Sequence, residues 1–239
     1  MKEIIAHTVL GYPNQEECLK QLEFWNDIGL RHWELQVPFS HPTADGPLIT
    51  EANKEGLENF KSLESLLNFI ENIEARFPEV RIEYMSYAQK LFFLAGSDHA
   101  GRIKALKNKH WIVPDLPLDD ELTQGIGDKL GLRFIPVIGL NTSKERIKIL
   151  LGHQPDWLYL MSGFQTTGKQ FQLSERLIDK VEEIRGMDSV KIGLGFGIRS
   201  LEDVNKAFEI ADFAILGSIF MEKRKRGEFE SFTQNLAGY

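Results

Sequence analysis

Two carboxylates, Glu34 and Asp45, are the residues of this sequence best placed for acid–base chemistry. Glu34 interrupts an otherwise apolar run, and Asp45 follows eleven positions later in a stretch rich in turn-forming residues, 39–47. Because side chains alternate along a strand, Glu34 should point opposite to Trp33 and Leu35, towards a barrel interior. Burial there would raise its pKa towards the range that suits proton transfer. We therefore predict an acid–base pair whose members have different surroundings.

Each carboxylate also has a structural interpretation. Glu34 could pair with a nearby Arg or Lys, and Asp45 could cap a helix that begins near Leu48, with Pro47 in its first turn. The pair is more informative than either member, because both carboxylates would reach the same rim of a sheet.

Glycines after the last two apolar runs suggest a phosphate site. Gly195 and Gly197 follow one run, and Gly217 with Ser218 follows the next and opens a helical segment. Glycine lets backbone N–H groups approach an anion, and a helix N-terminus adds its dipole. The alternative is that these glycines only make tight turns.

A long polar stretch, 159–169, follows another apolar run and resembles a mobile lid. Gly168 within it would add one more amide to the phosphate site. An ordinary surface loop is the alternative for this stretch.

The elements that must position these residues alternate along the chain. Short apolar runs of strand length are separated by longer segments of helical period, which predicts a parallel sheet. About eight strands suggest closure into a (β/α)8 TIM barrel, an α/β fold with a single domain over residues 1–239, with chemistry at the carboxyl ends of the strands. The expected strands are 4–9, 32–37, 81–85, 110–113, 133–138, 157–160, 191–194 and 213–216, and the expected helices include 14–28, 63–77, 119–130, 143–151, 174–185 and 201–210, besides one from residue 48.

Composition excludes other classes of protein. A net charge of −7 without a long basic run argues against nucleic-acid binding. The single Cys18 excludes a disulfide framework, and no signal peptide or membrane-spanning stretch is present, so we expect a cytoplasmic protein. The six scattered histidines form no ligand spacing, and we predict no metal. No nucleophile elbow or nucleotide-binding motif opens a helix.

Several blocks taken together resemble the α subunit of tryptophan synthase, in order and in approximate spacing. The resemblance covers nearly the whole chain, and the Pro-Phe-Ser to Ala-Asp-Gly-Pro block is the most specific part. The matching blocks are 10–13, 34–35, 38–40, 44–47, 114–117, 195–198 and 217–218.

The resemblance implies a lyase of tryptophan biosynthesis that cleaves indole-3-glycerol phosphate to indole and glyceraldehyde 3-phosphate. It also implies that no cofactor is needed in this subunit. Glu34 would protonate the indole ring at C3 and help to take the glycerol hydroxyl proton, Asp45 would polarise the indole N–H, and Tyr159 would lie beside Glu34. The implied substrate-cleft residues are Tyr87 and Phe196, and the implied phosphate-binding residues are Gly168, Gly197, Gly217 and Ser218.

The resemblance further implies a partner, a pyridoxal-phosphate β subunit in an α2β2 complex, which receives indole through a tunnel. The loops 39–45 and 114–117 would contact it, through His41, Pro42, Asp115 and Pro117. Here the sequence departs from the family pattern, because His41 stands where the family usually has Asp.

Other departures fall on the barrel floor and around the site. The N-terminal helix of the family is missing, and the arginine of the lid is absent. Gln36 replaces a glycine, His7 an aromatic or apolar residue, and Gln89 an asparagine. These changes keep two alternatives open: a non-catalytic or regulatory paralogue, and a free-standing lyase with an altered lid and partner surface. A third is a metal-dependent sugar-phosphate epimerase that uses His7 and His32.

Overall fold

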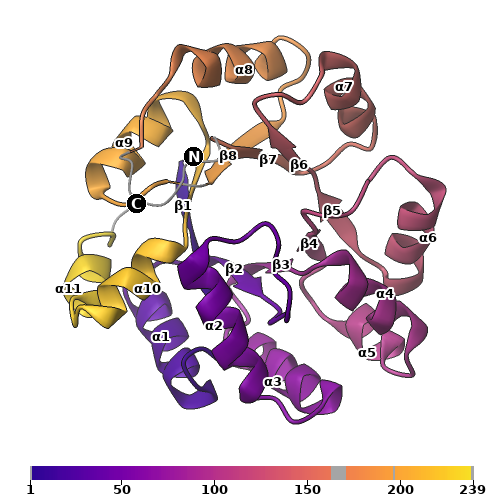
Figure 1. Cartoon of the computed structure of the whole chain (residues 1–239), viewed down its shortest axis with the longest axis vertical. Coiled ribbons are helices and arrows are strands. Elements are labelled where there is room, and N and C mark those ends of the chain that lie inside the picture. The colour runs from indigo at the N-terminus through magenta and orange to yellow at the C-terminus, as the bar shows by residue number, and fades with distance from the viewer. Residues whose placement is uncertain (1, 163–170, 196, 238–239) are drawn as a thin grey trace.

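The computed structural model describes residues 2–162, 171–195 and 197–237, and its strands form one parallel sheet curled into a barrel (Figure 1). The order around the sheet is β5-β4-β3-β2-β1-β9-β8-β7-β6. The strands are β1 (Glu3–Val9), β2 (His32–Gln36), β3 (Arg81–Met85), β4 (His110–Ile112), β5 (Arg133–Ile135), β6 (Val137–Gly139), β7 (Trp157–Met161), β8 (Lys191–Gly195) and β9 (Phe213–Leu216).

The ninth strand arises from a break at Pro136 in the single strand predicted over 133–138. Proline has no N–H to donate to a ladder, and it separates β5 from β6. β5 pairs with β4, while β6 pairs with β7, and the backbone N–H of Tyr159 donates to the Pro136 carbonyl at 2.9 Å. The two edge strands of the sheet, β5 and β6, are therefore joined through one residue, Pro136. Taken as one interrupted strand, they give the barrel the eight strands that the sequence predicts.

The helices form the outer layer, and the helices expected from the sequence are confirmed. Ser143 and Ser200 accept hydrogen bonds from the backbone N–H three residues on, and Asn14 does the same for the first helix. The helices are α1 (Gln15–Asp27), α2 (Pro47–Glu58), α3 (Leu63–Arg76), α4 (Ala88–Gly96), α5 (Ala100–Ala105), α6 (Glu121–Leu130), α7 (Lys144–Gly152), α8 (Glu175–Arg185), α9 (Leu201–Ile210), α10 (Ser218–Lys225) and α11 (Phe229–Gln234).

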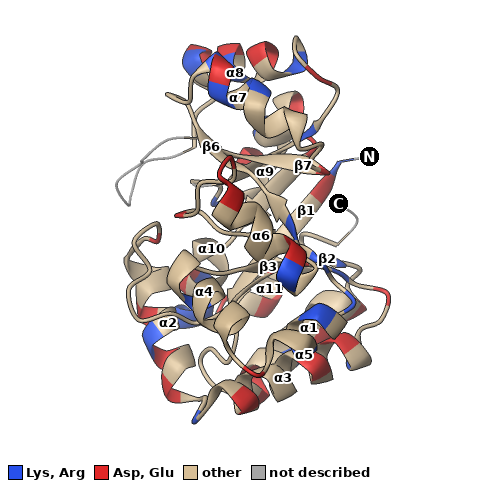
Figure 2. Ribbon diagram, turned by 90° about the vertical axis from the view of Figure 1, so that its right-hand side faces the viewer, with Lys and Arg blue, Asp and Glu red and all other residues tan. Residues whose placement is uncertain are grey.

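Three of these helices, α4, α5 and α11, were not among those expected from the sequence. Within the described residues β1 is the first element, beginning at Glu3. In the ribbon of Figure 2, positions of basic residues (blue) and acidic residues (red) are interspersed along the helices in view. None of the helices in the described ranges is both long and apolar enough to cross a membrane.

The described residues contain three buried apolar clusters, and the two larger ones lie on the two sides of the sheet. Trp33 and Leu35 belong to the outer core, between strands and helices, and are fully buried. The inner core fills the barrel with large side chains from alternate positions of the strands, joined by Tyr87 from just after β3: Ile5, Met85, Tyr87, Ile112, Ile135, Trp157, Tyr159, Phe213 and Ile215. The residues of β2 that alternate with Trp33 and Leu35, Glu34 among them, therefore point their side chains into the barrel interior.

Candidate active site

Glu34 lies on β2 and faces the barrel interior, as predicted, with 5% of its surface exposed. In the described part of the chain no Lys or Arg pairs with it, and its Oε2 atom has no hydrogen-bond partner. Burial raises its pKa to about 8, and the negative charges of Asp45 and Glu83 add to that effect. Glu34 is therefore protonated at neutral pH, and no Lys or Arg among residues 2–162, 171–195 and 197–237 supports its interpretation as a structural ion-pair partner.

His7, on β1, is a polar neighbour of Glu34. The register pairs the two residues across β1 and β2, and His7 Nε2 lies 4.0 Å from Glu34 Oε1. Burial lowers the pKa of His7 to about 4, so the ring is neutral at neutral pH. The contact between His7 and Glu34 thus joins two uncharged groups.

Asp45 lies in the loop between β2 and α2 and is held by two buried donors. Gln36 Nε2 donates to Asp45 Oδ2 at 2.7 Å, and the Tyr87 hydroxyl donates to the same oxygen at 2.9 Å. Burial raises the pKa of Asp45 to about 6, although both hydrogen bonds act in the opposite direction. The helix-cap alternative for Asp45 is wrong, because Gly46 is the N-cap of α2 and receives no side-chain hydrogen bond.

Tyr87 is fully buried, and its ring stacks on Phe39 at a centroid distance of 5.1 Å. Its hydroxyl also accepts a hydrogen bond from the Ala44 N–H at 3.1 Å. Tyr87 therefore anchors the loop that carries Asp45, in addition to contacting the carboxylate itself.

Tyr159, on β7, brings a phenol to the same part of the barrel and is 8% exposed. Burial, together with the charges of Glu34 and Asp45, raises its pKa well above the usual value, so the hydroxyl keeps its proton. The Tyr159 hydroxyl fits only because the residue facing it on β8 is a glycine. A Cβ atom built on Gly195 would lie 2.0 Å from the Tyr159 hydroxyl oxygen.

We expect Gly195→Ala to displace Tyr159 and to lower the free energy of unfolding by about 1–3 kcal/mol, because the interior has no space for the added methyl group. Urea unfolding followed by circular dichroism measures the change. Gly125→Ala is the matched control: a Cβ there meets nothing within 4 Å, and alanine in an exposed helix should stabilise by about 0.5–1 kcal/mol. Equal effects of the two substitutions would contradict the steric argument.

The two glycine loops lie at one rim of the barrel, because they follow β8 and β9, which are paired in parallel. Gly197 has a φ of +89°, which favours glycine, and Gly217 is the N-cap of α10. No side chain caps α10, so its first backbone N–H groups, beginning at Ser218, are not taken by a cap. Two other predicted residues, Gly168 and Phe196, and most of the predicted lid lie outside the described residues.

Comparison with known proteins places this geometry in a family. A family model described as tryptophan synthase alpha chain matches residues 1–236. The chain is 31% identical over 220 residues to the tryptophan synthase alpha chain of Thermotoga petrophila, covering 91% of this chain and 88% of that protein. It is 30% identical over 224 residues to that of Aquifex aeolicus, covering 92% and 85%.

The chain belongs to the tryptophan synthase alpha chain family. A solved structure from Aquifex aeolicus agrees with it at a TM-score of 0.84 and 27% identity, covering 99% of this chain and 90% of that one. A chain of the tryptophan synthase complex from Pyrococcus furiosus has the same fold, with a TM-score of 0.83, 21% identity and coverage of 99% and 98%.

The residues that the family resemblance assigns to a partner surface lie on two loops after β2 and β4. His41, Asp115 and Pro117 are exposed, whereas Pro42 is buried. Asp115 accepts a hydrogen bond from the Ala88 N–H at 2.8 Å and so fixes its loop against the start of α4.

Sequence reasoning missed two polar residues of the interior, Asn53 and Glu83. Asn53 is fully buried on α2, and its Oδ1 accepts hydrogen bonds from the Phe39 N–H at 2.9 Å and from Gln36 Nε2 at 3.4 Å. Glu83 is the register partner of Glu34 on β3. A signal was present for both, because Asn53 interrupts the apolar stripe of a helix and Glu83 interrupts an apolar strand, as Glu34 does.

The two histidines of the epimerase alternative have separate partners. His7 Nε2 lies 2.9 Å from Gln36 Oε1, while His32 lies within 3.2 Å of carboxylate oxygens of Glu3 and Glu83. Across the ranges that the structure describes, no group of three or more His, Cys, Asp or Glu residues could hold a metal ion.

Proposed function

We propose that this chain, as a single barrel domain, is a lyase of tryptophan biosynthesis that cleaves indole-3-glycerol phosphate to indole and glyceraldehyde 3-phosphate. Membership of the family supports the reaction. The observation that carries the proposal is the pair Glu34 and Asp45, because between pH of about 6 and about 8 one is protonated and the other ionised.

In the proposed reaction Glu34 supplies a proton to C3 of the indole ring, while Asp45 accepts a hydrogen bond from the indole N–H and stabilises the positive charge that develops there. Glu34, now a carboxylate, takes the proton of the hydroxyl on the carbon attached to C3. The carbon–carbon bond breaks, its electron pair returns to the ring, and the hydroxyl carbon becomes the aldehyde. Tyr159 would lie beside Glu34 as the third catalytic residue.

The phosphate would bind at the rim formed by the loops after β8 and β9. Gly197, Gly217 and Ser218 supply backbone N–H groups there, and the uncapped N-terminus of α10 favours an anion. Gly168 and Phe196 remain proposed members of the phosphate site and the substrate cleft, respectively. The reaction moves protons and one electron pair only, so we propose that this subunit uses no cofactor.

We further propose that a pyridoxal-phosphate β subunit is the partner and docks on the loops after β2 and β4, through His41, Pro42, Asp115 and Pro117. The exposure of three of these residues supports that surface.

We also propose a cytoplasmic location. The thiol of Cys18 is buried, and burial raises its pKa to about 11, which suits a core role.

The pH dependence of indole formation tests the assigned protonation states. Asp45 must be ionised, so the rate should fall as the pH drops through about 6; Glu34 must carry a proton, so it should also fall as the pH rises through about 8. We expect a bell-shaped profile of kcat/KM with a maximum near pH 7. A rate that keeps rising above pH 8.5 would contradict the role of Glu34 as the initial acid.

The same assay separates the proposed lyase from a paralogue that only binds. Pure protein is incubated with indole-3-glycerol phosphate, with and without a tryptophan synthase β subunit, and indole is measured. Indole in either case supports the lyase, and a rate that the β subunit increases supports the partner. Calorimetric binding of the substrate with no indole in either case would favour the non-catalytic paralogue.

A further inference from the structure

Asp45 has to be oriented by the barrel, because it lies on a loop outside any helix or strand. One of its two donors, Tyr87, extends from the end of β3. The other is Gln36, the last residue of β2, which is fully buried and donates at 2.7 Å. The amide group of a glutamine can flip and exchange its oxygen with its NH2 group. A hydrogen bond to the oxygen or to the NH2 group must therefore select which of the two faces Asp45.

Besides Asp45, the Gln36 amide has two partners: Asn53, whose Oδ1 accepts from Gln36 Nε2 at 3.4 Å, and His7 at the oxygen end. His7 Nε2 lies 2.9 Å from Gln36 Oε1. An ionised carboxylate only accepts hydrogen bonds, so the NH2 end of Gln36 must face Asp45 and its oxygen must face His7. His7 must then donate from Nε2, and its Nδ1 carries no proton. The Nδ1 atom is buried without a hydrogen-bond partner among the described residues, as this tautomer allows.

Gly217 makes room for this arrangement of His7. A Cβ atom built on Gly217 would lie 2.9 Å from His7 Nδ1, so a larger residue there would displace the imidazole. The contacts thus run from the loop after β9, through β1 and β2, to the carboxylate on the loop before α2.

We propose that His7 and Gln36 are positioning residues that act in series to aim the Asp45 carboxylate at the substrate. Neither touches the reacting atoms in this assignment. The catalytic consequence rests on the proposed cleavage reaction, whereas the orientation of Asp45 can be measured without any substrate.

The test combines three substitutions with one control in the intact chain. Gln36→Met keeps the length of the side chain and removes the amide, and His7→Phe keeps a ring and removes the N–H donor. His7→Gln restores a donor at that position. Gln21→Met is the control, because Gln21 is also a buried glutamine but accepts its hydrogen bond from Arg224 on the outer layer.

The first measurement is a carbon-13 NMR titration of the Asp45 carboxyl group, which faces Glu34, Tyr87 and Tyr159 as its other titratable neighbours. Loss of a hydrogen bond to the ionised form raises a carboxyl pKa, so Gln36→Met should raise that of Asp45 by about one pH unit. His7→Phe should produce a smaller rise, His7→Gln should reverse it, and Gln21→Met should leave it unchanged. Nitrogen-15 NMR of the unmodified protein should show His7 protonated at Nε2 only.

The second measurement is catalytic. We expect kcat to fall about tenfold in Gln36→Met with little change in KM, and the acidic limb of the pH profile to move upwards with the Asp45 titration. An Asp45 titration identical in Gln36→Met and the unmodified protein, or a His7 ring protonated at Nδ1, would overturn the proposal. If the unmodified protein forms no indole either, the proposed cleavage fails, while the NMR titrations still decide whether the two residues position Asp45.

Discussion

Glu34→Gln is expected to lower kcat for indole formation by about a thousandfold, while KM changes little. Glutamine keeps the shape of the side chain but has no proton to give to C3 and no carboxylate to receive the hydroxyl proton. Glu34 is buried and has a pKa of about 8. Water is a far weaker acid, so a water molecule at neutral pH would not replace Glu34 as the proton donor. Steady-state kinetics at pH 7 measure the effect.

The matched control for Glu34→Gln is Glu74→Gln on α3. Glu74 accepts hydrogen bonds from the Tyr84 hydroxyl and from the backbone N–H groups of Lys107 and Asn108, on the outer side of the barrel. The same chemical change there should alter stability slightly and leave kcat unchanged. A Glu34→Gln protein that retains more than a tenth of the parent kcat would rule out Glu34 as the main proton donor.

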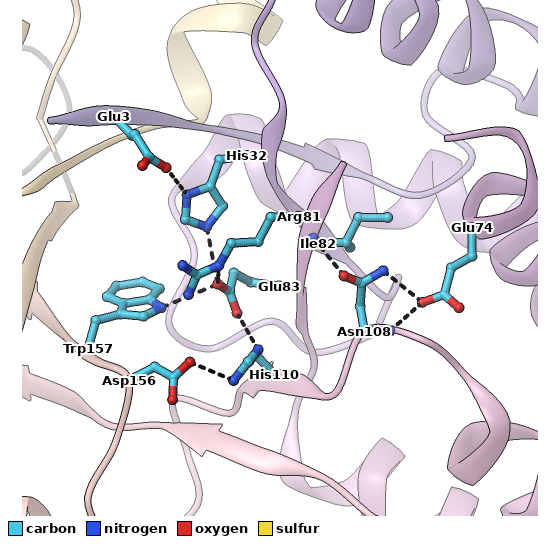
Figure 3. Close-up of polar contacts among 10 residues, drawn as sticks. All are labelled: Glu3, His32, Glu74, Arg81, Ile82, Glu83, Asn108, His110, Asp156 and Trp157. Carbon is cyan, nitrogen blue, oxygen red and sulfur yellow. Dashed lines mark hydrogen bonds and ion pairs between the residues drawn. The ribbon is translucent and has the colours of Figure 1, made fainter. Parts of the chain in front are cut away.

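Glu83→Ala is expected to have the largest effect on stability. Glu83 is fully buried on β3, and its Oε1 lies 3.1 Å from His32 Nε2, 2.8 Å from Arg81 Nε and 3.3 Å from Trp157 Nε1. Figure 3 shows these side chains converging on Glu83 from β2, β3 and β7, with His110 of β4 on the other side. Removing the carboxylate leaves buried donors without a partner, which typically costs about 3–5 kcal/mol.

Chemical denaturation at pH 7 measures this loss, and Glu71→Ala is its control. Glu71 pairs with Arg102 on the surface, and such pairs contribute less than about 1 kcal/mol. A Glu83→Ala effect as small as the control would show that the interior cluster contributes little.

The pH dependence of the Glu83→Ala effect gives a second check. Burial acts to raise the pKa of Glu83, but the hydrogen bond from His32 and the charges of Arg81, His32 and His110 outweigh it and lower the pKa below 4.5. A lowered carboxyl pKa stabilises the fold above the unfolded value and loses that contribution as the pH falls. The difference between Glu83→Ala and the parent should therefore shrink below pH of about 4.5.

Local pattern was sufficient for most of the architecture. The apolar runs 81–85 and 213–216 are confirmed as β3 and β9 with the predicted ends, because strand length and flanking turn residues are local properties. The inward direction of Glu34 was likewise predictable, since alternation along a strand needs no knowledge of distant residues.

The helices α4 and α5 show where local pattern is weak. Phe92 and Phe93 on α4 are 40% and 61% exposed, so apolar residues extend beyond the buried stripe and blur the helical period. α5 has only six residues, too few to present a full period. α4 and α5 pack against each other and against α6, and their positions depend on that packing rather than on their own sequence.

The sequence by itself determined the barrel, the interior position of Glu34, and the rim that carries Asp45 and the glycine loops. Tertiary structure alone decided the surroundings of these residues. The ladder register brings His7 and Glu83 beside Glu34, and loop conformation brings Asp45 to Gln36 and Tyr87. The reason is physical: alternation is a property of a single strand, whereas pKa values and hydrogen bonds depend on distances between segments far apart in the chain, which only the closed barrel sets.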